Sequence, residues 1–179
     1  MLFLIFGCIG KDLTGLPVLG YSDSEDAVEW TKIGDSSDGL NNPRDLGFNP
    51  DRPSELWVVN RTDDSVSIFF DAGTASQTSQ HIIDPFALHF MEEVSSIEFG
   101  NSGTFGTCQE SRNTYNDQSP PDDFMGPTLW SSDLDIFGKT NPDAVRYLSN
   151  LHGMPIDLGS HLDMLHETPL CMGIAWQYE

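Results

Sequence analysis

Apolar and polar residues alternate in short runs through the first half of the chain, and turn-forming residues separate these runs. Each run is rich in β-branched and aromatic side chains, which favours strands over helices. The clearest runs are residues 45–48, 56–60, 66–71 and 80–83. The polar connection 61–65 is short enough for an antiparallel hairpin. The pattern therefore predicts one four-stranded antiparallel sheet.

A single sheet of this kind leaves a face exposed, so it needs neighbours of its own type. Further strands are predicted at residues 28–33, 87–90, 95–100, 104–108 and 124–132. His89 falls in one of these apolar runs and is interpreted as a core histidine. Asn141 suits a helix N-cap and Pro142 the first helical position, which predicts one short helix over residues 141–148.

The first set of runs also resembles a known repeat. Pro-Arg-Asp-Leu-Gly-Phe, Glu-Leu-Trp-Val-Val-Asn and Asp-Ser-Val-Ser-Ile-Phe-Phe-Asp are similar to the blade pattern of NHL-repeat six-bladed β-propellers. Arg44 and Asp45 stand where that family usually has glycine. The matching positions are Pro43, Leu46, Leu56, Val58, Val59, Asn60, Ser65, Val66, Ile68, Phe70 and Asp71.

This resemblance implies an all-β fold, a partial β-propeller of four-stranded antiparallel blades. Six blades need roughly 250 residues, so a chain of 179 residues corresponds to about half a ring, and we expect a fragment. We expect a signal-like segment at 1–8 and a polar lead-in at 9–39. The first blade is expected at about 40–84, the second at about 85–150 and the start of a further blade at about 151–179, where residues 169–176 resemble an opening strand.

The charge balance limits the partners. The chain has 28 acidic and 8 basic residues, a formal net charge of −20. Because phosphate binding needs a basic surface, nucleic acid is excluded as a partner. Such acidity keeps a protein soluble and attracts cations or basic ligands. The expected partners are a small ligand, a peptide or a protein.

The apolar run at residues 1–8 ends in Gly-Cys and resembles the lipobox of bacterial lipoproteins, with Cys8 as the lipidated residue. We expect an exported protein, either lipid-anchored in the bacterial cell envelope or extracellular, that contacts a membrane through that anchor. The alternative is a buried N-terminal strand, because the run is short and lacks a preceding positive charge. Cys108 and Cys171 are either a disulfide pair or two buried thiols.

Three of the five histidines lie between residues 151 and 166. His161 and Asp163 would face the same side of an extended strand, and a turn would bring His166 to them. These three are candidate ligands of a divalent metal, zinc or calcium, and imidazole with carboxylate also suits iron or copper. A second interpretation is acid–base chemistry, with His161 or His166 oriented by Asp157 or Asp163. The third interpretation is that these side chains cap turns and form hydrogen bonds with backbone groups.

The sequence contains no Gly-x-Ser-x-Gly, phosphate-binding glycine loop, Cys-x-x-Cys or His-Glu-x-x-His motif. The leading hypothesis is an exported NHL-like propeller that acts as a binding or scaffold module for a small ligand, peptide or protein partner. The alternative is a metal-assisted lyase or hydrolase with its His/Asp site at the central channel. A third hypothesis is a fragment without activity of its own.

Overall fold

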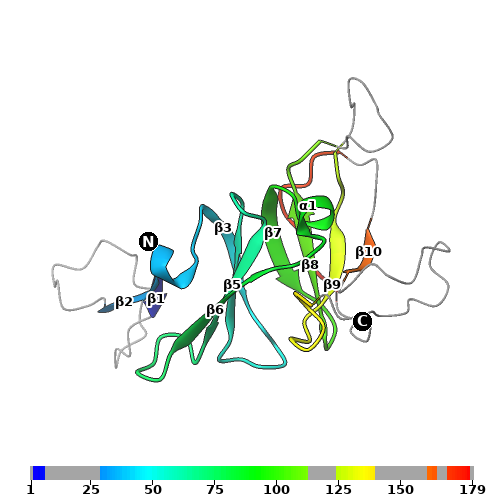
Figure 1. The fold of residues 1–179 in the computed structure, drawn as a ribbon. Coiled ribbons are helices and arrows are strands. Elements are labelled where there is room, and N and C mark those ends of the chain that lie inside the picture. The colour runs from blue at the N-terminus through cyan, green and yellow to red at the C-terminus, as the bar shows by residue number, and fades with distance from the viewer. Residues whose placement is uncertain (1, 7–28, 113–123, 140–160, 165–168, 178–179) are drawn as a thin grey trace, which may run out of the picture.

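The described part of the chain consists of antiparallel β-sheets joined by turns and two short helical segments (Figure 1). The computed structural model describes residues 2–6, 29–112, 124–139, 161–164 and 169–177. Within these ranges the strands form one two-stranded and two four-stranded sheets. The prediction of an all-β class is confirmed.

The first four-stranded sheet follows the chain order, so each strand pairs with the next in an antiparallel meander. Its strands are β3 (Pro43–Phe48), β4 (Leu56–Asn60), β5 (Ser65–Phe70) and β6 (Thr78–Ile83). Pro43 occupies the first strand position, where its missing N–H does not interrupt the ladder. The predicted four-stranded antiparallel sheet is confirmed.

The second four-stranded sheet is also an antiparallel meander, in the order β10-β9-β8-β7. Its strands are β7 (Val94–Phe99), β8 (Thr104–Gln109), β9 (Thr128–Ser131) and β10 (His161–Met164). Because β10 completes this sheet, the boundary that we expected near residue 150 falls inside it. The expected helix at 141–148 lies outside the described residues.

The strand predicted at residues 87–90 is wrong, because these residues form the helical turn α1 (Ala87–Phe90). Asp84 starts the turn: its carboxylate accepts a hydrogen bond from the N–H of Phe86 at 2.9 Å. Ala87 and Phe90 are buried, and the N–H of Met91 bonds to the carbonyl of Ala87. An apolar spacing of three and four residues is helical, so four apolar residues were too few to distinguish the two periods. His89 therefore lies half-buried on this turn and not in a strand.

The third sheet pairs β1 (Leu2–Phe6) with β2 (Glu29–Gly34), followed by the 3-10 turn η2 (Ser36–Asp38). The predicted strand near residues 28–33 is confirmed. Residues 2–6 form a strand, which does not decide between a lipobox and a buried N-terminal strand. Lipidation concerns Cys8, which lies outside the described residues, and stays a prediction.

The two four-stranded sheets pack face to face around aromatic side chains. Trp57 of β4 is fully buried, and its ring lies 5.4 Å from Phe99, 5.2 Å from Phe105 and 5.8 Å from Phe137. Buried aromatic pairs at such distances add to the stabilisation from apolar burial. A second cluster, which includes Ile33 and Leu40, covers the other face of the first sheet. Every residue of β4 is therefore buried.

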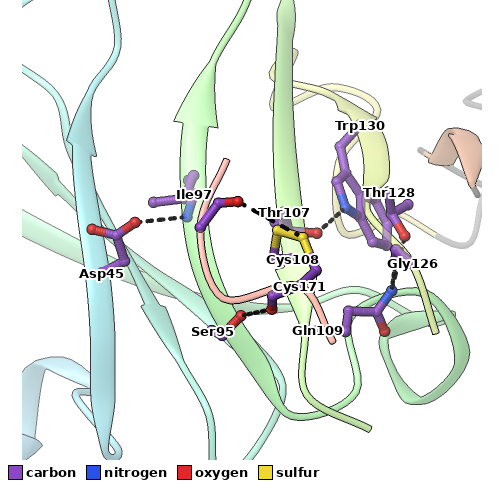
Figure 2. Close-up of a disulfide and its surroundings, with 11 residues drawn as sticks. Asp45, Ser95, Ile97, Thr107, Cys108, Gln109, Gly126, Thr128, Trp130 and Cys171 are labelled. Carbon is purple, nitrogen blue, oxygen red and sulfur yellow. Dashed lines mark hydrogen bonds between the residues drawn. A yellow bond between two sulfur atoms is a disulfide. The ribbon is translucent and has the colours of Figure 1, made fainter. Parts of the chain in front are cut away.

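The first strands of the two sheets, β3 and β7, lie side by side where the sheets meet (Figure 1). Asp45 in β3 accepts a hydrogen bond through Oδ2 from the N–H of Ile97 in β7, at 3.0 Å (Figure 2). Asp45 therefore supplies a polar link between the sheets.

Residues 169–176, which we expected to form the opening strand of a further blade, do not form a strand. Residues 169–177 have irregular secondary structure and contact the second sheet. Their attachment to that sheet is through side chains and a disulfide and not through a β-ladder. Within the described ranges, no helix combines the length and apolar character needed to cross a membrane.

Candidate functional site

His161 and Asp163, two of the candidate metal or acid–base residues, lie in β10. His161 pairs with Trp130 and Asp163 with Leu129 of β9, and the register shifts between the two pairs. Regular alternation, on which the prediction of a shared face depended, is interrupted at this point. His166 and Cys8 lie outside the described residues. The metal and acid–base hypotheses therefore stay predictions.

No set of three His, Cys, Asp or Glu side chains within the described ranges has an arrangement that could hold a metal ion. Asp157 lies outside those ranges as well. Zinc or calcium binding therefore has no support from the described residues.

Cys108 and Cys171 are joined by a disulfide with their Cα atoms 5.3 Å apart (Figure 2). Cys108 lies in β8 and is fully buried, whereas Cys171 belongs to the irregular segment 169–177. Ser95 Oγ donates to the carbonyl oxygen of Cys171 at 2.9 Å. The bond closes a separation of 63 residues and fixes the segment against the second sheet.

Charged side chains gather where the β4–β5 turn meets the loop before β7 and the end of β8. We call this group the loop-end cluster; its members are Arg44, Arg61, Asp64, Glu92, Glu93 and Glu110. Glu110 Oε2 lies 3.0 Å from Arg61 Nε and 3.3 Å from Arg44 Nη2. Arg61 Nη2 lies 3.2 Å from Glu93 Oε1. Arg44 of β3 and Arg61 of the β4–β5 turn thus pair with glutamates next to the strands of the second sheet.

Backbone geometry places the acidic members of the cluster. Asp64 and Glu93 have positive φ values of 52° and 54°, which turn the chain sharply at both sites. Asp64 Oδ1 accepts a hydrogen bond from the Glu93 N–H at 2.7 Å. The N–H of Glu110 bonds to the carbonyl of Glu93 at 3.0 Å. One turn of the first sheet is therefore attached directly to the entry of the second.

The cluster holds two carboxyl groups whose ionised forms are disfavoured. Burial raises the pKa of Asp64, and the nearby charges of Asp63 and Glu93 add to this, while the hydrogen bond from Glu93 N–H opposes it. Burial also raises the pKa of Glu92, helped by the charges of Asp64 and Glu93. Four carboxylates here face two guanidinium groups. A positive charge brought near this end would stabilise the ionised carboxylates.

A second polar group forms a ring of polar contacts across β4, β5 and β6. Asn60 Nδ2 donates to Ser65 Oγ and to Ser67 Oγ, both at 3.0 Å. Ser65 Oγ donates to Asp63 Oδ1 at 2.7 Å. His81 closes the ring, with Nδ1 3.4 Å from Ser67 Oγ and Nε2 3.4 Å from Asp63 Oδ2.

Ser67 Oγ accepts from the amide of Asn60 at 3.0 Å and lies 3.4 Å from His81 Nδ1, a pair in which the donor depends on the tautomer of the imidazole. Ser67 is fully buried. Through these contacts the buried Ser67 of β5 links Asn60 of β4 to His81 of β6.

Sequence reasoning missed both groups. Ser65 and Ser67 alternate on one strand, and Asn60 and His81 are their cross-strand partners. The hairpin register, once known, would have brought these four together. The loop-end cluster has no such local signal, because its carboxylates come from separate loops.

Comparisons with known proteins identify no relative: no family model, no curated protein and no solved structure matches this chain.

Proposed function

We propose that the protein is an NHL-like propeller that binds a positively charged segment of a peptide or protein partner at the loop-end cluster. The observation that supports this most is the joining of loops from both four-stranded sheets into one group in which carboxylates outnumber guanidinium groups.

The arrangement of the sheets supports the propeller part of the proposal. Two consecutive antiparallel meanders pack face to face, as neighbouring blades do, and their first strands lie side by side. Propellers contain four to eight such blades around a central channel. In this proposal β3 and β7 are the innermost strands of two successive blades.

Electrostatics supports a cationic partner. The whole chain carries a formal net charge of −20, so its long-range potential attracts positive groups. Locally, both arginines of the cluster are already paired with glutamates. Asp64 and Glu92, with their raised pKa values, gain most from a new positive neighbour. A lysine- or arginine-rich segment would supply the positive charge that the carboxylates at this end of the molecule outnumber.

The test is binding of a fluorescent peptide of alternating lysine and glycine to the full chain, followed by anisotropy. Glu92→Gln with Glu93→Gln should weaken binding by about tenfold, as expected for the loss of two nearby charges. The matched control is Asp71→Asn with Asp135→Asn, which removes the same net charge from exposed positions elsewhere. Equal losses in both double variants, or no binding to the wild-type protein, would reject the proposed site.

Export and a lipid anchor at Cys8 remain part of the proposal. The alternative of a metal-assisted lyase or hydrolase depends on His166 and on other residues outside the described ranges, so it stays a prediction.

A further inference from the structure

Residues 169–177 lie against the face of the second sheet that points away from the first. We call this segment the strap. Phe105 of β8 faces the aromatic core between the sheets, so its neighbours Gly106 and Thr104 face the other way. Cys108 lies on the same face as Gly106, two residues further along. The strap therefore covers the side of the sheet opposite the core.

Gly106 of β8 and Gly100, which follows β7, make room for two side chains of the strap. A Cβ placed on Gly100 would lie 2.7 Å from three atoms of the Trp176 ring. A Cβ on Gly106 would lie 2.7 Å from Ile174 Cδ1. Real Cβ atoms essentially never come this close to another atom. The strap and the sheet are therefore complementary in shape at two points.

Despite this fit, non-covalent attachment of the strap is slight. Ile174 and Trp176 are only partly buried, and Leu170 and Met172 are exposed. The strap has irregular structure and so gains no ladder of backbone bonds. Ordering a segment costs conformational entropy at every residue, and a few half-buried side chains do not offset that cost.

From these contacts we infer that the Cys108–Cys171 disulfide is a redox-controlled latch, which holds the strap on the second sheet and whose reduction uncovers that face. The reductant is an external dithiol. It supplies two electrons and two protons, the Sγ–Sγ bond breaks into two thiols, and the dithiol becomes a disulfide. This inference is independent of the proposed binding function.

The state of Cys108 reports whether the strap is seated. Cys108 is fully buried in the sheet, and Cys171 is partly exposed. A thiol reacts with an alkylating agent only where the agent can reach it. If the strap leaves on reduction, both thiols become accessible; if it stays, Cys108 remains covered.

The experiment uses the full chain with Cys8→Ser, which leaves one pair of cysteines. The protein is treated with dithiothreitol, then with iodoacetamide under native conditions, and alkylation of each cysteine is followed by mass spectrometry. We expect Cys108 and Cys171 to react at rates within about threefold of each other, because both are then open to solvent. Far-ultraviolet circular dichroism should stay unchanged. Alkylation of Cys108 slower by about a hundredfold, the rate of a protected core thiol, would overturn the latch.

Two variants keep the test decisive. Cys171→Ser lacks the latch without any reductant, and its Cys108 should be alkylated as fast as in the reduced protein. Gly100→Ala with the disulfide intact should displace Trp176 and raise its fluorescence quenching by acrylamide, whereas Gly173→Ala, whose added methyl meets nothing within 4 Å, should not. Loss of the β-sheet signal on reduction would make the disulfide a staple of the whole fold and would also overturn the latch.

Discussion

Asp45 of β3 accepts a hydrogen bond through Oδ2 from the N–H of Ile97 in β7, at 3.0 Å, and so links one four-stranded sheet to the other. The other carboxylate oxygen, Oδ1, accepts from the N–H of Leu46 at 2.9 Å. Ile97 is buried, so its N–H has no ready replacement partner in solvent. One side chain therefore satisfies a backbone donor in each sheet.

Replacing Asp45 with alanine should expose the importance of that link. An unsatisfied buried N–H costs about 1–3 kcal/mol, so we expect Asp45→Ala to lower the free energy of unfolding by about 2 kcal/mol in urea denaturation. Asp45→Asn keeps one acceptor oxygen and should lose about half as much. Hydrogen exchange of the Ile97 amide should accelerate in the alanine variant. Unchanged exchange there would show that the bond contributes little.

Asp64→Asn should stabilise the protein at neutral pH. Burial raises the pKa of Asp64 in the folded state above its ordinary value, so the ionised carboxylate opposes folding at pH 7. Asparagine has no charge, keeps an oxygen for the Glu93 N–H and tolerates the positive φ. Because Asp64 is partly exposed, we expect the free energy of unfolding at neutral pH to rise by only about 0.5 kcal/mol.

The pH dependence of this gain follows from the raised pKa. As the pH falls through the folded-state pKa of Asp64 toward 3.8, the carboxyl takes up its proton and the advantage of asparagine should disappear. Asp71→Asn is the matched control, since Asp71 has a φ of 50° in the next turn. A gain of equal size in both variants that does not change with pH would show that backbone preference, and not charge, is responsible.

Asn60→Asp should be strongly destabilising although the two side chains have nearly the same shape. The amide of Asn60 donates to Ser65 and Ser67 inside the sheet, and a carboxylate donates nothing and adds a buried negative charge near Asp63. We expect a loss of about 2–4 kcal/mol in thermal or urea unfolding at pH 7. Asn101→Asp, at an exposed turn, is the control. Similar small losses in both would show that the ring tolerates rearrangement.

The strands that the sequence predicted correctly are those whose local residue pattern is sufficient to define them. Residues 56–59 form a continuous apolar run that Asn60 follows, and β4 spans these five residues, all of which are buried. Residues 87–90 are apolar too, yet they form a helical turn that Asp84 starts. Four residues are too few to distinguish the apolar period of a strand from that of a helix, so the local pattern did not predict the helical turn.

The parts that sequence did not place depend on contacts between distant segments. Cys108 and Cys171 are 63 residues apart, and no local pattern decides whether they meet. Asp64, Glu93 and Glu110 come together because two sheets pack against each other. The first sheet was predictable because its register follows from one turn after another, whereas the loop-end cluster needs the packing of one sheet on the next.

Gly39→Ala tests the contact between the N-terminal part of the chain and the polar ring. Gly39 has a φ of +85°, and an added Cβ would lie 2.4–2.7 Å from atoms of the His81 side chain. Gly103 has a similar φ of +77°, but a Cβ there would meet nothing within 4 Å. Gly103→Ala therefore carries the backbone penalty alone, about 1 kcal/mol for a left-handed alanine.

Gly39→Ala should lower the free energy of unfolding by about 1–3 kcal/mol more than Gly103→Ala does. The reason is that its methyl group must push the His81 ring out of its place between Ser67 and Asp63. Urea unfolding of both variants measures the difference. Adding His81→Ala should remove most of the extra loss in Gly39→Ala and none of the loss in Gly103→Ala. If the two glycine variants lose the same amount, the imidazole moves aside freely and the ring does not fix it.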